Sequence, residues 1–307
     1  MKSILRRLRK LNWQNSDIIA TMSGRIFSRV IAVGATFFVA WVAWTQNAPP
    51  KLTTNKVTDD LYEIEGDGGN VAVYITNEGL IVIDDKYERD HDNIAAEIKS
   101  ISSQPVKYVL STHYHEDHSG GNAKMLAGGA EVISTAMARK NIVNKVQSNA
   151  TINPTPARIV FNDETSVFLG GKEVRAKYYG RGHTNGDAVM YFPALRTVHT
   201  GDLMSGNTPL IDYPGGGSLV EWTKTLDGVL NGLDFDRVIP GHGPITNKAG
   251  LLAYRNNVEK LRNRAQSLVR EGKSREELAK VMTAEFNWAA NGLQMQWSIP
   301  GMMTELK

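Results

Sequence analysis

Short apolar runs alternate with segments of helical spacing in the first half of the chain's body. Leu61–Ile64 and Val71–Ile75 flank the glycine-rich segment 66–70, and two such runs around a turn predict a hairpin. Leu80–Ile83 is continuously apolar, as expected of a strand buried on both faces, and it ends at Asp84. The pattern then predicts a helix at 92–101, strands at 105–110 and 131–134, and a helix at 135–146.

The second half repeats this organisation. Its pattern predicts hairpin-like strands at 158–162, 166–169, 173–179, 188–192 and 196–200. A helix at 218–233, a last core strand at 237–239 and helices at 248–271 and 275–284 follow. Ser274 and Glu277 have the spacing of a capping box at the start of the last helix.

The two halves are continuous, because no low-complexity linker divides them. We therefore predict one α/β (α+β) domain over residues 49–307, a sandwich of two packed sheets with helices outside. The C-terminal helices 248–284 are expected to pack on this domain. Three methionines of the C-terminal tail are expected to dock these helices rather than to bind metal, namely Met295, Met302 and Met303.

The first 48 residues have a different character from the body. Residues 1–29 are basic and polar, and Val30–Trp44 is an unbroken run of apolar or small residues. This order is typical of a secretory signal, although no clean cleavage site follows. We interpret residues 1–48 as a signal peptide or an uncleaved membrane anchor. In either case we expect an exported body, periplasmic or secreted, with 30–44 as the membrane contact of an anchored form.

Composition narrows the class of protein and of ligand. The chain is 41% hydrophobic and 22% charged, which is typical of a globular protein. It has no cysteine, so any metal must be held by histidines and carboxylates. Of its 35 basic and 32 acidic residues, residues 1–48 contain seven and one, which leaves 28 and 31 in the body. A mildly acidic body argues against a nucleic-acid partner and favours a small-molecule substrate.

Residues 113–118 contain the densest group of potential metal ligands. His113, His115 and His118 stand with Glu116 and Asp117 in six positions, in a chain with seven histidines. Imidazole nitrogens and carboxylate oxygens are ligands that suit zinc. The preceding apolar run and the following glycine pair place the group on a strand-to-helix loop, where α/β sheets carry their chemistry. A polar surface loop is the weaker interpretation of so dense a group.

Three further loops each follow an apolar strand and contain a potential ligand. These ligands are His183, Asp202 and His242, and each has a glycine beside it. Glycine permits sharp turns and a close approach of the backbone to an ion. One Gly-His-Gly sequence is weak evidence, but four loops at strand ends together indicate a shared metal site.

These motifs resemble the metallo-β-lactamase superfamily of zinc hydrolases, over nearly all of residues 60–245. The resemblance implies a four-layer αβ/βα sandwich, the metallo-β-lactamase fold, with two zinc ions at one edge between the sheets. It implies the ligands His113, His115 and His183 for the first ion, and Asp117, His118 and His242 for the second, with Asp202 bridging. It also implies that Asp84 does not bind the metal itself but orients residues that do.

Two branches of this family share features with the chain. Gly180–Thr184 and Ser218–Trp222 resemble the best-studied subclass of zinc β-lactamases. That subclass, however, has Arg where His118 stands, Cys where Asp202 stands and Lys where Ser205 stands. His118 together with Asp202 is instead the pattern of glyoxalase II and of many general hydrolases in the family.

The resemblance implies carbonyl hydrolysis. A hydroxide between the two ions would attack the carbonyl carbon, and Asp117 would orient it and shuttle its proton. The substrate is a β-lactam or similar cyclic amide in one hypothesis, and a thioester, lactone or other ester in the alternative. A mononuclear iron dioxygenase of this fold and a binding protein without turnover are further alternatives, and the complete ligand set argues against the last.

Residues near the motifs have two interpretations each. Tyr213 and Arg181 could contact substrate or serve the fold. Residues 66–70 could cover the metals as a flexible lip or form an ordinary turn. His91 and His199 are predicted not to be ligands.

Overall fold

The computed structural model describes residues 51–307 except 148–150, 152–153 and 207. The predicted signal or anchor, residues 1–48 with the apolar run Val30–Trp44, lies outside the described residues. Residues 50–307 form one compact unit. No helix in the described part of the chain has both the length and the apolar character needed to cross a membrane.

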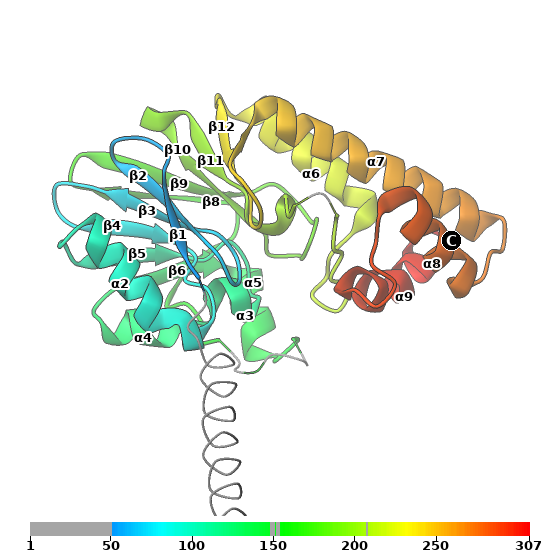
Figure 1. Ribbon diagram of the computed structural model, residues 1–307, viewed down its shortest axis with the longest axis horizontal. Helices are drawn as coiled ribbons and strands as arrows, with labels where there is room; N and C mark the ends of the chain where they lie inside the picture. Colours follow the sequence, from blue (N-terminus) through cyan, green and yellow to red (C-terminus); the bar gives the residue numbers. More distant parts are fainter. Residues whose placement is uncertain (1–50, 148–150, 152–153, 207) are drawn as a thin grey trace, which may run out of the picture. The chain divides into compact units, whose positions relative to one another are not determined.

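The first sheet has seven strands, which lie side by side in sequence order (Figure 1). They are β1 (Thr53–Lys56), β2 (Leu61–Glu65), β3 (Val71–Ile75), β4 (Leu80–Ile83), β5 (Val106–Leu110), β6 (Glu131–Thr135) and β7 (Ile159–Phe161). Strands β1 to β4 pair antiparallel, and β4 to β7 pair parallel. The parallel strands end at one edge, so Asp84 after β4 and the histidines after β5 emerge together.

The second sheet has six strands in the order β13-β12-β11-β10-β9-β8. They are β8 (Glu164–Leu169), β9 (Lys172–Tyr178), β10 (Ala188–Phe192), β11 (Thr197–His199), β12 (Arg237–Ile239) and β13 (Thr246–Asn247). β11 and β12 pair parallel, and the other neighbours pair antiparallel. Asp202 after β11 and His242 after β12 are therefore delivered to one edge of this sheet.

One strand belongs to a different sheet from the one predicted. The sequence pattern places 158–162 among the hairpin-like strands of the second half, but β7 pairs parallel with β6 in the first sheet. Because it follows the helix α5 (Ala136–Val143), β7 completes a parallel crossover, and Phe161 packs between the sheets. The hairpin of the second half begins at β8.

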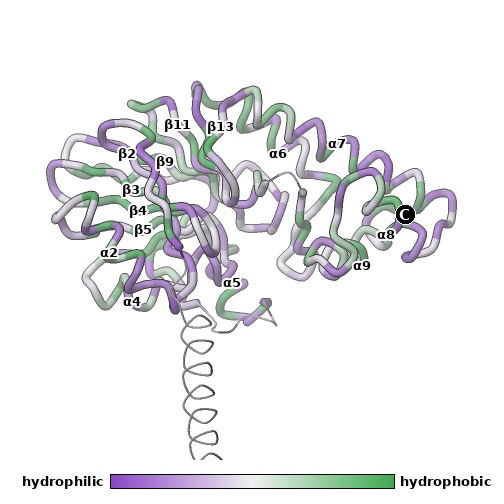
Figure 2. Tube along the Cα trace, in the orientation of Figure 1, coloured by the Kyte–Doolittle hydropathy of each residue, from purple (hydrophilic) through white to green (hydrophobic). Residues whose placement is uncertain are grey.

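The sheets pack face to face, and side chains alternate between the two faces of each strand. On β10, Met190 and Phe192 point into the core between the sheets, whereas Val189 and Tyr191 join the cluster on the helical side. Phe192 meets Tyr74 of the first sheet edge-to-face, with ring centroids 5.2 Å apart. In Figure 2 the apolar colour accordingly follows the central strands.

Helices cover both outer faces, which confirms the predicted four-layer αβ/βα sandwich. The first sheet packs against α2 (His91–Ile101) and α4 (Asn122–Ala127) through a cluster that includes Val82 and Ile98. The second packs against α6 (Leu219–Gly232) and α7 (Lys248–Arg270). Short helical turns complete the sandwich, namely η1 (Glu88–Asp90), α3 (Glu116–Ser119), η2 (Pro193–Leu195) and η3 (Gly201–Leu203).

The C-terminal segment extends the helical layer over the second sheet. It consists of α8 (Arg275–Phe286), a π-helical turn η4 (Gln294–Ser298) and α9 (Ile299–Glu305). Ser274 and Glu277 form the predicted capping box at α8. Met295 and Met302 are buried in the cluster that α6 and α7 share, as the docking interpretation predicts, and Met303 packs against it. Figure 1 shows α8 and α9 beside α7, far along the chain from the strands that carry the histidines.

Candidate metal centre

The side chains of all seven predicted ligands meet at one edge of the sandwich, where loops from both sheets come together. The loop after β5 and the start of α3 supply four of them, and the loops after β9, β11 and β12 supply one each. Their donor atoms form three overlapping groups, and within each group the atoms lie within 4.8 Å of one another. The groups are His113/His115/His183, His113/His118/Asp202 and Asp117/His118/His242.

The first of these groups contains only imidazoles. His115 Nδ1 lies 3.0 Å from His113 Nε2 and 2.9 Å from His183 Nε2. All three rings are almost completely buried. Burial and the neighbouring imidazoles lower the pKa of His113 well below its usual value, so a neutral ring is favoured there.

The Asp117/His118/His242 group combines two imidazoles with one carboxylate. His242 Nε2 lies 3.2 Å from both Asp117 Oδ2 and His118 Nε2. Burial opposes ionisation of Asp117, but His118 and His242 outweigh it and hold the pKa of this carboxyl below its usual value. The group is therefore anionic on one side and offers imidazole nitrogens on the other.

Asp202 lies between the two groups and directs one oxygen to each. Its Oδ2 is 3.6 Å from His183 Nε2, and its Oδ1 is 3.3 Å from His118 Nε2 and 3.4 Å from His242 Nε2. Burial opposes its ionisation, but His242 and His118 hold the pKa of Asp202 well below its usual value. One ionised carboxylate thus faces both sets of nitrogens.

The hydrogen bonds behind the rings decide which nitrogen of each histidine carries its proton. His118 Nδ1 lies 2.7 Å from Asp84 Oδ2, and His183 Nδ1 lies 2.6 Å from the carbonyl oxygen of Leu210. Carboxylates and carbonyls only accept hydrogen bonds, so these ring nitrogens must be the donors. When these rings are neutral, as binding a metal requires, their Nε2 atoms keep a lone pair that points into the centre. Burial opposes a charge on His118, but Asp117, Asp202 and Asp84 outweigh burial and raise the pKa of His118 well above its usual value, so this ring releases a proton when it binds a metal.

The same assignment extends to the other two histidines after β5. The Thr112 hydroxyl donates to Asp84 Oδ2, so it accepts from His113 Nδ1, 3.1 Å away. His115 Nε2 lies 2.9 Å from Asp212 Oδ2, which directs the lone pair of His115 Nδ1 inward. These tautomers follow from the hydrogen-bond network. With the four rings neutral, four lone pairs converge on the centre.

This arrangement fits a cation. Unprotonated imidazole nitrogens 2.9–3.0 Å apart repel one another unless a positive charge lies among them. Asp202 Oδ1 is buried and has no well-oriented hydrogen-bond donor among the described residues. The Nε2 atoms of His118 and His242 flank it at 3.3 and 3.4 Å. Imidazole and carboxylate donors without cysteine suit zinc, so the residues present fit that metal.

Two glycines let the backbone approach the ligands closely. A Cβ atom at Gly241 would lie 2.0 Å from Asp202 Oδ1, and one at Gly69 would lie 2.2 Å from the His118 ring. Either contact is far below van der Waals distance, so any side chain there would displace a predicted ligand. Gly69 belongs to the β2–β3 hairpin, which therefore touches the centre.

That hairpin, residues 66–70, is anchored at its end. Gly69 N donates to the Asp117 carbonyl, and the buried ammonium of Lys86 donates to the Gly69 carbonyl, at 2.9 and 2.6 Å. Asn70 Nδ2 donates to the carbonyls of Pro240 and Gly243 in the loop of His242. The hairpin thus joins two of the ligand loops.

Sequence reasoning missed three residues that shape the centre. Asp212 accepts from His115 and from the Tyr114 hydroxyl. Burial raises the pKa of Asp212, but the hydrogen bond and charge of His115 and the hydrogen bond from Tyr114 together outweigh burial and lower it to about 2. Lys86 was missed because it lies in a charged stretch after β4. Trp297, whose ring centroid is 5.5 Å from that of His115, comes from the C-terminal segment. Nothing in the local sequence of either region marks a metal site.

The remaining predicted residues have other partners. His199 is buried and bonds to the Asn70 carbonyl, and His91 lies on α2, so neither joins the ligand groups. Arg181 donates to the carbonyls of Gly216 and Gly217 and pairs with Glu221. Tyr213 donates to Glu305. Arg181 and Tyr213 therefore hold the loop before α6.

A cavity of about 500 Å³ opens over the centre. His115, Asp117, Asp202 and His242 form its floor, and the hairpin contributes residues on one side. Trp297 forms the opposite wall, together with other residues of the C-terminal segment. The cavity can hold a small molecule over the donor atoms.

Proteins of similar sequence are metallo-beta-lactamases. The model of the metallo-beta-lactamase superfamily matches residues 64–242. The chain is 26% identical over 224 residues to a metallo-beta-lactamase type 2 of Elizabethkingia meningoseptica, covering 69% of this chain and 86% of that protein. It is 24% identical over 189 residues to a metallo-beta-lactamase type 2 of Bacillus cereus, covering 60% and 70%.

Solved structures show the same fold. A metallo-beta-lactamase from Pontibacter korlensis superposes with a TM-score of 0.60 at 20% identity, over 68% of this chain and 99% of that one. The DIM-1 metallo-beta-lactamase superposes with a TM-score of 0.60 at 21% identity, over 69% and 98%.

Proposed function

The chain belongs to the metallo-β-lactamase superfamily, and from this premise we propose that it is an exported dinuclear zinc hydrolase that opens a β-lactam or similar cyclic amide. The family makes it a metal-dependent hydrolase. The observation that carries the dinuclear proposal is the position of Asp202, whose two oxygens face different groups of imidazole nitrogens.

The number of donors supports two ions rather than one. Seven side chains supply inward-facing donors, whereas a catalytic zinc ion usually takes three protein ligands. His113, His115 and His183 would hold the first ion, Asp117, His118 and His242 the second, and Asp202 would lie against both. When bound, two such ions lower the pKa of a water molecule and polarise the carbonyl that it attacks.

The chain's own groups then orient the reactants. Asp117 is held by His242 on one side and borders the cavity on the other, where its carboxylate can accept a proton from the attacking water. Asp84, Asp212 and the Leu210 carbonyl fix the histidine rings and keep their lone pairs inward. Burial of the ligand groups keeps water from competing for these hydrogen bonds.

An alternative substrate class is favoured by two ligand positions. His118 and Asp202 match the glyoxalase II-type pattern, and Ser205, not a lysine, borders the cavity. A thioester, lactone or other ester hydrolase of the same fold therefore remains the second candidate. The curated relatives named metallo-beta-lactamase favour the first.

Export is part of the proposal and depends on the first 48 residues. Their basic start and the apolar run Val30–Trp44 support a signal peptide or a membrane anchor. Fractionation of cells that express the full chain tests this directly. Activity in the periplasm or at the outer face of the membrane is expected, and activity confined to the cytoplasm would contradict export.

One comparison of substrates tests the proposed reaction. The zinc-loaded full chain is incubated separately with a chromogenic cephalosporin, a thioester and a lactone, and the metal-stripped chain is the control. We expect rapid ring opening of the cephalosporin that disappears on stripping and returns with zinc. Preferred hydrolysis of the thioester or lactone would establish the alternative, and no turnover of any of the three would overturn the proposal.

A further inference from the structure

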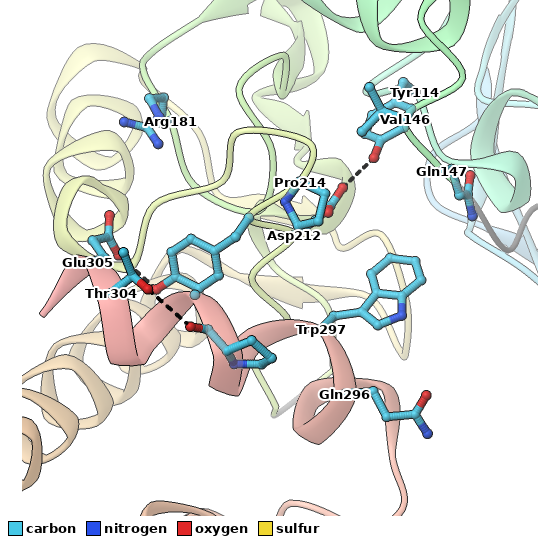
Figure 3. Close-up of a pocket in the computed structure, with 13 residues that line it drawn as sticks. Tyr114, Val146, Gln147, Arg181, Asp212, Pro214, Gln296, Trp297, Thr304 and Glu305 are labelled. Carbon is cyan, nitrogen blue, oxygen red and sulfur yellow. Dashed lines mark hydrogen bonds between the residues drawn. The ribbon is translucent and has the colours of Figure 1, made fainter. Parts of the chain in front are cut away.

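A second and larger cavity adjoins the metal cavity. It has a volume of about 730 Å³ and lies between the loop before α6 and the C-terminal turns η4 and α9. Trp297 and Gln147 line both cavities, so the two spaces share a wall. Figure 3 shows Trp297 and Gln147 at one side of the larger cavity and Arg181 and Glu305 at the other, with Asp212 and Pro214 between them.

The apolar part of this lining comes from three distant segments of the chain. Val146 follows α5, Tyr213 and Pro214 belong to the loop before α6, and Trp297 and Pro300 come from the C-terminal segment. These side chains offer ring faces and aliphatic surface rather than hydrogen-bonding groups. The surface therefore suits an apolar ligand group.

The charged residues of the lining are already engaged. Glu305 accepts hydrogen bonds from the Tyr213 hydroxyl, Ser218 Oγ and Leu219 N. Asp212 is bonded to His115 and Tyr114. With Arg181 paired to Glu221 and to two carbonyls, little charge is left to bind an ionic group.

We infer that this cavity binds an apolar, uncharged substituent of the substrate while the scissile carbonyl lies over the metal centre. The inference rests on the proposed function and names the substrate class more closely: a cyclic amide or ester that carries an aromatic or aliphatic side chain. Trp297 would contact the substrate in both cavities, because its ring lies against His115 of the metal centre and also lines the apolar cavity.

Paired substrates that differ only in one phenyl ring test this inference. The zinc-loaded full chain is assayed with two chromogenic cephalosporins, one with a phenylacetyl and one with an acetyl side chain. We expect kcat/KM to be about tenfold higher for the phenylacetyl compound, the lower end of what an apolar pocket achieves for one extra group. Equal values for the two compounds would overturn the inference.

A substitution that fills the apolar cavity tests whether the phenyl ring binds there. Thr304 is an exposed residue of α9 that lines the cavity, so Thr304→Trp should lower the phenylacetyl-to-acetyl ratio from about ten towards one. Thr283→Trp, at an exposed threonine of α8 that lines neither cavity, is the matched control and should keep the ratio. An unchanged ratio in Thr304→Trp would assign the preference to another surface and overturn the inference.

Binding of unreactive ligands separates this inference from the proposed reaction. N-phenylacetylglycinamide and N-acetylglycinamide are titrated calorimetrically into the zinc-loaded chain. Tighter binding of the phenylacetyl compound, lost in Thr304→Trp, would support the apolar cavity even if no cephalosporin were hydrolysed. Equal affinities would overturn it even if hydrolysis were fast.

Discussion

The metal centre and the apolar cavity next to it are built in opposite ways. The centre is polar and largely buried, with Asp117 and His242 partly exposed, and each histidine after β5 has a hydrogen-bonding partner behind it. The apolar cavity is formed largely by ring faces and aliphatic surface, and several of its residues, such as Gln296 and Thr304, are exposed. The centre therefore tolerates little change, whereas the cavity can accept substitution without loss of the fold.

The two regions also depend on different parts of the fold. The ligands stand at the ends of strands β5, β9, β11 and β12, whose positions are set by the core between the sheets. The apolar cavity depends on η4 and α9, which pack on the outer helical cluster and bond to the loop before α6 through Ser298 and Glu305. We infer that the sandwich fixes the chemistry and that the C-terminal segment determines which substrates reach it.

The largest effect is expected inside the centre. His118→Ala removes an inward donor and the partner of Asp84, so the second ion should be lost. We expect kcat/KM to fall by more than the roughly 10–100-fold typical of losing a residue that only orients a ligand. Metal content and activity of the zinc-loaded variant measure this.

The control for that variant is His91→Ala, at a histidine of α2 outside the ligand groups. It should keep the metal content and the activity of the unmodified chain. A His118→Ala protein that still held two tightly bound ions would show that the second group is assigned wrongly.

A smaller effect is expected for residues that hydrogen-bond to the metal ligands without binding the metal themselves. Asp212→Ala removes the acceptor of His115 Nε2–H, so the ring and its inward lone pair are no longer fixed. Zinc affinity should fall about 10–100-fold, as measured by competition with a chelator. Tyr114→Phe removes another hydrogen-bond donor to Asp212 and leaves the bonds from His115 and Gly215, so it should change the affinity much less. Equal losses in both variants would indicate a general disturbance of the loop.

Substitution of Trp297, which separates the metal cavity from the apolar cavity, should change KM by an amount that depends on the substrate. Trp297→Ala should raise KM for the phenylacetyl cephalosporin about fivefold, because the largest apolar surface of the cavity is lost. Trp297→Phe, which keeps a ring, should recover most of this affinity. If Trp297→Ala instead lowered the zinc content of the protein, the tryptophan would belong to the metal centre rather than to the substrate wall.

The last prediction concerns the stability of the fold rather than activity. Burial raises the pKa of Glu63 on β2 from its usual 4.5 to about 7, so folding favours its protonated form. That stabilisation is present below pH 4.5 and is lost as the pH rises through 7, by about 3 kcal/mol at most. Glu63→Gln should flatten the fall in unfolding free energy between pH 5 and 8, measured with urea. An unchanged pH slope would show that Glu63 does not titrate with folding.

The sequence predicts the metal centre better than it predicts the substrate wall, and the reason is physical. Ligands at the ends of apolar strands are visible as His or Asp beside glycine, so the loops of His113, His183 and His242 could be recognised. β7 was placed in the wrong sheet because a three-residue strand has too few positions to show which face is buried. Asp212 and Trp297 act through residues about 97 and 182 positions away, and no local pattern records such contacts.

The number of metal ions per chain tests the central claim most directly. The purified full chain is saturated with zinc, freed of excess metal by gel filtration and analysed for zinc and protein by mass spectrometry. Two ions per chain are expected, because Asp202 directs its oxygens to two separate groups of donors. A content that stays at one ion or fewer with zinc in excess would contradict the dinuclear centre and the reaction proposed for it.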